Sequence, residues 1–293
     1  MLHLGFMRFR PGFIACGLLI SILPAQLLAA GLTFQAVKKE IVEQRLQSFS
    51  RDNGQRELIL KKMFSDVGCA EHLSEEPVKH VKQPDLICVL PGKSDQAIVV
   101  GAHFDHVSLG DGVVDNWSGA SLLPTLYEGL RTRPARHTFI FVAFSGEEKG
   151  ELGSAAYVRS MSKDEVARTL AMINMDTLGL GPTEMWLSHA DPYLAVALNA
   201  VAKSLQLPLG VVNVDQVGSS DSEQFAKRKI PRITIHSVTQ ETWPILHSPR
   251  DNMRAIRLDD YYHSYRLIQG YLAFLDGALG QKQESPGGKS AAK

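Results

Sequence analysis

Histidines and acidic residues recur directly after the apolar runs of this chain. The first pair, His103 and Asp105, follows the run 97–102, and further acids stand after later runs: Glu147, Glu148 and Asp176. Because the carboxyl ends of parallel strands meet at one sheet edge, where ligands of open α/β sheets gather, we expect these side chains to lie together. Crowded carboxylates repel one another unless cations lie between them. Imidazole nitrogens with carboxylate oxygens suit zinc best, and manganese or cobalt less well.

Two loop residues could reach the same edge. Asp115 lies in the loop that leaves the first of these strands, and His247 lies in a loop after the last strand. Adjacent strand residues face opposite ways, so Glu147 and Glu148 can share one site only on a turn, which Gly146 permits. The structural alternatives are a solvated acidic turn for this pair, a cap for Asp176, a salt bridge for Asp105 and a buried core role for His103.

The elements that must position these residues alternate between strands and helices. The apolar runs and turn residues predict strands over 85–90, 96–102, 138–144, 170–175, 184–188, 211–214 and 232–236, with a weaker edge strand within 71–81. Helical spacing occurs in 34–64 (two helices divided at Asn53-Gly54), 118–130, 152–161, 193–205, 222–229 and 258–279. This order predicts a three-layer α/β/α sandwich with a central mixed, mainly parallel sheet. Residues 31–280 are expected to form a single domain.

The two ends of the chain differ from this domain. Arg8 and Arg10 precede an apolar run over 13–28, and small residues follow it, so residues 1–30 read as a signal peptide. The alternative is an uncleaved N-terminal membrane anchor. Cleavage would leave a secreted or periplasmic protein with no stable membrane insertion. Residues 281–293 read as a flexible tail.

The composition limits the classes of function. Hydrophobic residues make up 44% of the 293, and 31 basic residues balance 31 acidic ones. These values argue against a disordered chain, and the absence of a basic excess argues against a nucleic-acid partner. After signal cleavage two cysteines remain, Cys69 and Cys88. In an oxidising compartment they could form a disulfide; otherwise they are two separate buried thiols.

The residues singled out above also carry a family resemblance. Five segments, in order and with similar spacing, resemble the signature segments of the secreted bacterial di-zinc aminopeptidases: Gly101–Asp105, Asp115–Gly119, Gly146–Glu148, Asn174–Asp176 and His247–Asp251. These metallopeptidases share a fold with glutaminyl cyclases and glutamate carboxypeptidases. Each segment is a weak signal alone, but five in order are a strong one.

The resemblance implies two zinc ions and a role for each site residue. His103 and Asp176 would hold one metal, Glu148 and His247 the other, and Asp115 would bridge them. Glu147 would be the catalytic general base. Asp105, grouped with it as catalytic, would hold the His103 ring. The resemblance also implies a cis peptide bond between Asp115 and Asn116.

The function so implied is that of a metal-dependent aminopeptidase. Such an exopeptidase hydrolyses N-terminal bonds of peptide substrates with a water bridged by two zinc ions. One alternative is a glutaminyl-peptide cyclotransferase with one zinc; that branch usually has a tryptophan where Leu246 stands, which favours the peptidase. A binding protein that lost its metals is a further alternative, but no ligand position is missing here.

Four neighbouring residues stand outside the predicted set of metal ligands. Trp117 and Trp243 could line a substrate pocket or pack in the core. Asp251 is expected to order its loop rather than bind metal. Asp221 follows Ser220 as in the family, but Ser222 stands where a histidine is frequent, so Asp221 is expected at most to support the site.

Overall fold

The computed structural model describes residues 34–215 and 218–280. The predicted signal peptide (1–30) and flexible tail (281–293) lie outside the described residues. Within the described ranges, no helix has the length and the apolar character that crossing a lipid bilayer requires.

A mixed sheet forms the centre of the molecule. Its strands are β1 (Leu73–Glu76), β2 (Asp85–Leu90), β3 (Ser94–His103), β4 (His137–Phe144), β5 (Thr169–Met175), β6 (Thr183–Met185), β7 (Leu209–Val211) and β8 (Arg232–His236). They lie in the order β1-β2-β4-β3-β5-β8-β6-β7. The four central strands β4, β3, β5 and β8 run parallel to one another. On one side β2 pairs antiparallel with β4 and β1 with β2, and on the other side β6 pairs antiparallel with β8 and parallel with β7. Parallel central strands bring their carboxyl ends to one edge.

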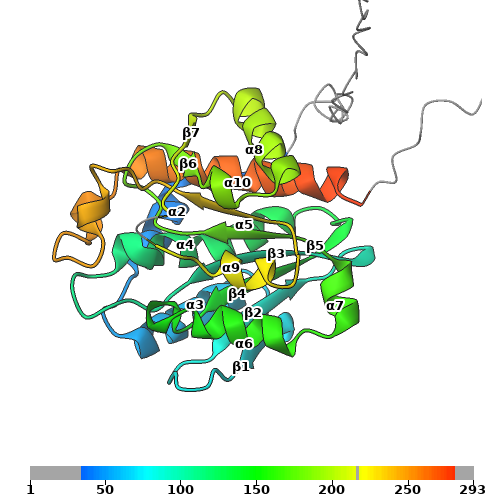
Figure 1. Ribbon diagram of the computed structural model, residues 1–293, viewed down its shortest axis with the longest axis horizontal. Coiled ribbons are helices and arrows are strands. Elements are labelled where there is room, and N and C mark those ends of the chain that lie inside the picture. The colour runs from blue at the N-terminus through cyan, green and yellow to red at the C-terminus, as the bar shows by residue number, and fades with distance from the viewer. Residues whose placement is uncertain (1–33, 216–217, 281–293) are drawn as a thin grey trace, which may run out of the picture.

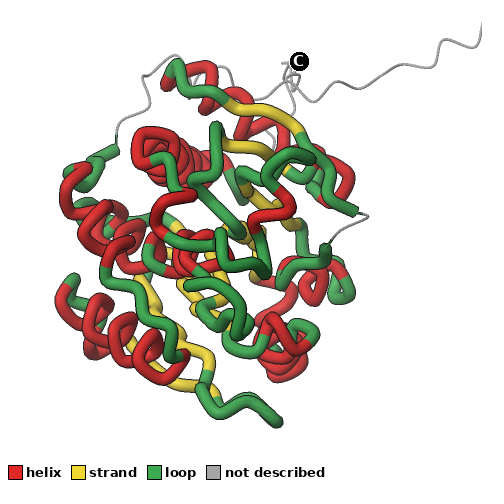
Figure 2. Tube along the Cα trace, turned by 90° about the vertical axis from the view of Figure 1, so that its left-hand side faces the viewer, coloured by secondary structure: helices red, strands yellow, loops and turns green. Residues whose placement is uncertain are grey.

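Helices cover both faces of this sheet (Figures 1 and 2). They are α2 (Lys39–Gln47), α3 (Asn53–Asp66), α4 (Ser118–Ala120), α5 (Leu122–Leu130), α6 (Leu152–Ser160), α7 (Lys163–Arg168), α8 (Pro192–Leu205), α9 (Ser222–Ala226) and α10 (Leu258–Ala278). The side chains of α2, α3, α5, α8 and α10 join one large core, and Tyr157 of α6 and Phe225 of α9 join a smaller core on the opposite face. The architecture is therefore the predicted three-layer α/β/α sandwich.

The central strand β3 shows why the sequence folds this way. Its apolar half, Ala97–Ala102, is buried throughout, because helices cover the strand on both faces and leave no polar side. Gly101 suits this position because a side chain there would collide with Phe144 and Met172. The strand ends at His103, and its tight packing fixes where that histidine emerges.

Local signals set the helix ends around this core. The Asp52 side chain accepts the backbone N–H of Gln55 and so begins α3, and Asp191 caps α8 in the same way. Pro124 falls in the first turn of α5, where its missing N–H costs no hydrogen bond.

The structure differs from the sequence prediction mainly at short elements. The edge strand β7 covers Leu209–Val211 rather than 211–214, and β6 ends at Met185 rather than at 188. β7 is an edge strand, and β6 pairs with it over three residues only, so few hydrogen bonds define the limits of either strand. The short helix α7, which a Ser162–Glu165 capping box begins, was not predicted.

A disulfide joins Cys69 to Cys88. Cys69 follows α3, and Cys88 lies in β2, which pairs with the edge strand β1. Both residues are fully buried. Of the two alternatives left open by the sequence, the structure has the disulfide, which ties the helix α3 to the sheet.

Candidate metal centre

The acids and histidines predicted to meet do so around one cavity. The cavity has a volume of about 310 Å³ and lies at the carboxyl ends of the central strands. The segments that line it are strand ends and loops on the side that faces the viewer in Figure 2. The predicted ligands on its wall are His103, Asp115, Glu148, Asp176 and His247, and Glu147 lies beside them.

His103 presents one ring nitrogen to the site. Its Nδ1 lies 3.1 Å from the backbone oxygen of Asp105, which can only accept, so Nδ1 carries the proton and Nε2 is left free to bind. Nε2 lies 3.2 Å from Oδ1 of Asp115 and 3.6 Å from Oδ1 of Asp176. The ring is 1% exposed, so its orientation is fixed by packing.

Asp115 stands between the two histidines. While its Oδ1 faces His103, its Oδ2 lies 3.1 Å from Nε2 of His247. The residue lies at a kink in the segment Val113–Trp117, where its backbone is not helical, and its peptide bond to Asn116 is cis, as the resemblance implies. One carboxylate thus faces two imidazoles with two different oxygens, which is the arrangement of a bridging ligand.

Asp251 holds the backbone of this segment. Its carboxylate accepts the backbone N–H groups of Val114 at 2.7 Å and Asp115 at 3.2 Å. Its own backbone oxygen accepts the N–H of Asp111 at 2.7 Å. Asp251 therefore orders the loop that carries Asp115, as expected, and neither of the two groups of candidate metal ligands among the described residues includes it.

Glu147 and Glu148 reach the site from a single 3₁₀ turn after β4, Glu147–Lys149. Gly146 begins this turn with a φ of 72°, a backbone conformation that glycine adopts without strain. Oε2 of Glu148 lies 3.0 Å from Nε2 of His247, and Oε2 of Glu147 lies 3.9 Å from Nε2 of His103. The turn lets adjacent glutamates face one cavity.

The Asp105 carboxylate contacts Glu147 more closely than it contacts His103. Its Oδ1 accepts the backbone N–H of Glu147 at 3.1 Å and lies 3.7 Å from Nδ1 of His103. It is the backbone oxygen of Asp105 that orients the His103 ring. The residue therefore links the end of β3 to the glutamate turn.

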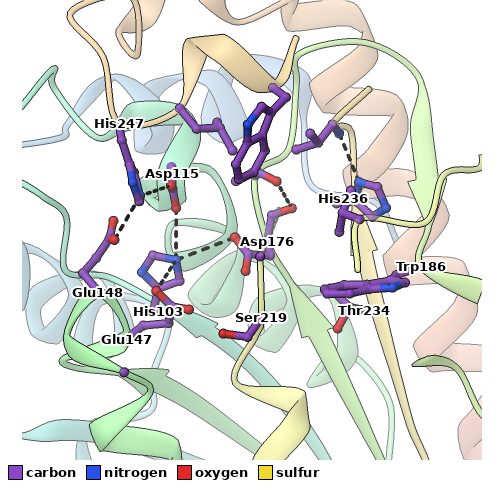
Figure 3. Close-up of a pocket in the computed structure, with 17 residues that line it drawn as sticks. His103, Asp115, Glu147, Glu148, Asp176, Trp186, Ser219, Thr234, His236 and His247 are labelled. Carbon is purple, nitrogen blue, oxygen red and sulfur yellow. Dashed lines mark hydrogen bonds and ion pairs between the residues drawn. The ribbon is translucent and has the colours of Figure 1, made fainter. Parts of the chain in front are cut away.

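Within the described ranges, two groups of side chains could each hold a metal ion. One is His103, Asp115 and Asp176, and the other is Asp115, Glu148 and His247. Within each group the ligand atoms lie within 4.8 Å of one another. Figure 3 shows how the groups meet at Asp115, with Glu148 and His247 on one side and Asp176 on the other.

The crowding of these carboxylates changes their protonation. Burial raises the pKa of Glu147 well above its ordinary value, and the negative charges of Asp221, Asp176 and Asp115 raise it further. Burial likewise raises the pKa of Glu148 to about 7 and raises that of Asp176. Simultaneous ionisation of all the carboxylates in this site is therefore unfavourable.

The histidines respond in the opposite sense. Burial lowers the pKa of His103, but the charge of Glu147 and contacts with the surrounding carboxylates outweigh it and raise this pKa well above its ordinary value. The contact with Asp115 raises the pKa of His247 to about 9. The site therefore attracts positive charge, which protons or divalent cations can supply.

Apolar side chains and a few polar ones complete the lining of the cavity. Trp186, Trp243 and Val238 are among them, together with Thr234 and His236. In Figure 3, Trp186 and His236 lie across the cavity from Glu148. His236 is held between backbone groups, since its Nε2 lies 2.9 Å from the oxygen of Val212 and its Nδ1 accepts the N–H of Val238 at 3.1 Å. Burial lowers its pKa to about 4, so His236 adds no charge to the cavity at neutral pH.

Only some of these lining residues could be identified from the sequence. Trp243 is at the cavity wall, but Trp117 is fully buried in the core. Neither Trp186 nor His236 was assigned to the site from the sequence. The place of His236 at the end of β8, on the same sheet edge as the ligands, is the signal that could have identified it.

Asp221 is buried beside the site. Its side chain is 1% exposed, and burial raises its pKa well above the ordinary value. Ser222, which stands where the family often has a histidine, lies 2.9 Å from the hydroxyls of both Ser220 and Thr234. The substitution therefore puts a hydroxyl cluster in place of a ring.

Comparison with known proteins places this geometry in a family. Residues 85–272, which contain all five candidate metal ligands, match peptidase family M28. The chain belongs to peptidase family M28. Aminopeptidase YwaD of Bacillus subtilis is 27% identical over 236 residues, a match that covers 77% of this chain and 48% of YwaD.

Solved structures show similar folds. BSAP, a zinc aminopeptidase from Bacillus subtilis, superposes with a TM-score of 0.60 at 25% identity, over 65% of this chain and 49% of BSAP. A glutaminyl cyclase from an Acidobacteriales bacterium superposes with a TM-score of 0.68 at 17% identity, over 82% of this chain and 93% of the cyclase, and shows the fold alone. This M28 chain spans about half the length of the two Bacillus aminopeptidases that it matches.

Proposed function

We propose that this M28 peptidase is a zinc-dependent aminopeptidase that uses two metal ions. The observation that carries the proposal is the pair of ligand groups that share Asp115 and open into one cavity, whose lining also includes Trp186 and Trp243. The similarity to zinc aminopeptidases supports the choice of metal and reaction.

The donor set fits two zinc ions. Each group offers one imidazole nitrogen and carboxylate oxygens, a set that zinc prefers. Oε1 of Glu148 is buried, and no described residue is its hydrogen-bond partner, so an oxygen is available there. His103, Asp115 and Asp176 would hold one ion, and Asp115, Glu148 and His247 the other. When bound, two such ions lower the pKa of water and polarise a carbonyl.

Glu147 is the proton carrier in this proposal. It belongs to neither ligand group, yet its carboxylate faces the same cavity, and Asp105 holds its backbone N–H. From this position Glu147 takes a proton from the attacking water and passes it to the nitrogen of the leaving amine. General acid–base catalysis of this kind contributes roughly 10²–10⁴-fold to a rate.

The part of the cavity across from Glu148, around Trp186 and His236, would receive the side chain of the N-terminal residue. Trp186 and Trp243 provide apolar surface, and His236 is uncharged and already engaged with the backbone. A charged side chain would lose its hydration there and find no counter-charge. We therefore propose peptides with an uncharged, apolar N-terminal residue as substrates.

We further propose that the protein works outside the cytoplasm. The signal-like residues 1–30 and the disulfide between Cys69 and Cys88 support this location, since disulfides persist in oxidising compartments. N-terminal sequencing of the exported protein tests the proposal: a start near residue 31 supports it, and an intact start in the cytoplasm contradicts it.

The deciding experiment combines metal analysis with hydrolysis of aminoacyl p-nitroanilides. Wild type, Glu147→Gln and a matched control, Glu75→Gln on the edge strand β1, are compared. Two zinc ions per chain are expected in all three, with activity lost in Glu147→Gln alone. One zinc and formation of pyroglutamate from glutaminyl peptides would instead identify a cyclotransferase. A protein that binds no metal and hydrolyses nothing would refute the proposal.

A further inference from the structure

Arg56 is a fully buried arginine that lies outside the matched part of the chain and contacts the backbone next to the candidate metal centre. It belongs to α3, whereas the match to family M28 begins at residue 85. Its side chain has no exposed surface. Arginine is rarely buried without partners, so its contacts require an explanation.

The guanidinium joins two ends of one loop. Nε donates to the backbone oxygen of Ser50 at 2.6 Å, and Nη1 donates to that of Phe104 at 2.9 Å. Nη2 donates to the oxygens of Asp111 at 2.6 Å and Gly112 at 2.8 Å. The fork therefore spans the loop 104–112, with one hydrogen bond at its start and two at its end.

Each end of that loop carries part of the metal centre. Phe104 lies between His103 and Asp105, and Gly112 immediately precedes the segment that contains Asp115. The guanidinium carbon also lies 5.5 Å from the centre of the Trp117 ring, two residues after Asp115. Arg56 thus contacts both chain segments whose separation sets the distance from His103 to Asp115.

The positive charge of Arg56 interacts with nearby carboxylates at a distance and not through a direct ion pair. Among the residues that the structure describes, no carboxylate lies within ion-pair distance of the guanidinium, and its hydrogen bonds go to backbone oxygens. Burial lowers its pKa to about 10, opposed by the negative charges of Asp251, Asp105, Asp115 and Glu148. The group remains positively charged at neutral pH.

We propose that Arg56 is a positioning residue for the metal centre, which sets the spacing of His103 and Asp115 by clamping both ends of the loop 104–112. The inference rests on the proposed function, since it assumes that these two residues bind zinc. Of its two properties, the hydrogen-bonding fork acts on geometry and the charge acts against cation binding. Loss of the fork should therefore weaken zinc binding, whereas loss of the charge alone should strengthen it.

Two substitutions separate these effects, and a third is the control. Arg56→Met removes the fork and the charge, while Arg56→Lys keeps the charge but cannot reach oxygens at both ends of the loop. The control is Arg228→Met, because Arg228 also donates to two backbone oxygens, those of Val158 and Met161, on the opposite face of the sheet. The control substitution Arg228→Met should lower the stability of the protein without changing the metal centre.

The measurements are zinc affinity by chelator competition and the absorption spectrum of the cobalt-loaded protein. We expect Arg56→Lys to bind zinc at least tenfold more weakly, within the range of roughly 10–100-fold seen when groups that orient metal ligands are lost. Arg56→Met should also bind more weakly, but by a smaller factor, because it loses the charge as well as the fork. The cobalt spectra of both variants should change, kcat should fall more than KM rises, and Arg228→Met should match wild type. If Arg56→Met does not fold, Arg56→Lys alone is compared with wild type in zinc affinity and cobalt spectrum.

The outcomes distinguish this inference from the proposed function. Folded Arg56 variants with wild-type zinc affinity and cobalt spectrum would overturn the positioning role and leave the aminopeptidase proposal standing. Tighter zinc binding in Arg56→Met, with Arg56→Lys unchanged, would assign Arg56 a purely electrostatic role and also overturn it. A wild-type protein that binds no zinc would refute the proposed function itself.

Discussion

Removing the disulfide between Cys69 and Cys88 should lower the free energy of unfolding by about 3 kcal/mol. The two residues are 19 apart in sequence. A cross-link that closes a loop of this length removes about 11 cal/mol/K from the entropy of the unfolded chain, which is about 3 kcal/mol at 25 °C. For a domain of this size, the melting temperature should fall by roughly 6–12 °C.

A cycle of alanine substitutions isolates that contribution. Cys69→Ala and Cys88→Ala each lose the disulfide and one buried sulfur, whereas the double variant loses both sulfurs but the disulfide only once. In urea unfolding, the two single losses should therefore sum to about 3 kcal/mol more than the loss in the double variant. An excess below about 1 kcal/mol would refute the loop-entropy reasoning.

Three further predictions follow from the site. Asp251→Asn puts an amide donor against a backbone N–H, so chelator competition should show zinc affinity reduced roughly 10–100-fold, and unchanged affinity would contradict the role of Asp251. Because burial lowers the pKa of His236 to about 4, the unfolded chain takes up a proton near pH 6.5 before the folded chain does. The stability that depends on a neutral His236 is thus complete above pH 6.5 and is lost as the pH falls through 4. In urea unfolding from pH 4.5 to 7.5, the free energy of unfolding should therefore fall less steeply with decreasing pH in His236→Gln than in wild type. An equal fall in both proteins would assign the pH dependence to other groups. Trp243→Ala should lower kcat/KM for leucyl p-nitroanilide about tenfold more than for the alanyl substrate, and an equal loss on both would exclude a side-chain pocket there.

The part of the site carried by the sheet could be predicted from the sequence. His103 and Asp176 each end or follow a strand whose apolar residues are buried on both faces, so the hydrophobic pattern fixes where these side chains emerge. Gly146 marked the turn that brings Glu147 and Glu148 into one cavity, because few other residues adopt its backbone conformation. In each case one local signal determines the position of the side chain.

The rest depends on contacts between distant segments. Arg56 stands in a helix with many charges, so its sequence context predicts a solvent-facing residue, and only the loop packed over it reveals its burial. Trp186 follows the short strand β6, and its place in the cavity depends on residues distant in sequence, since Val214 and Thr234 line the same cavity. Hydrophobic periodicity describes one element at a time and carries no information on such packing.

The two histidines of the candidate metal centre differ widely in their access to solvent. The His103 side chain is 1% exposed at the end of a buried strand, whereas the His247 side chain is 53% exposed on a loop. Two ions bound at these places would exchange at different rates, because a chelator can approach the His247 side directly. Brief chelation would then produce a form with one ion, on the His103 side, and the measured stoichiometry would depend on how long the protein had been exposed to chelator.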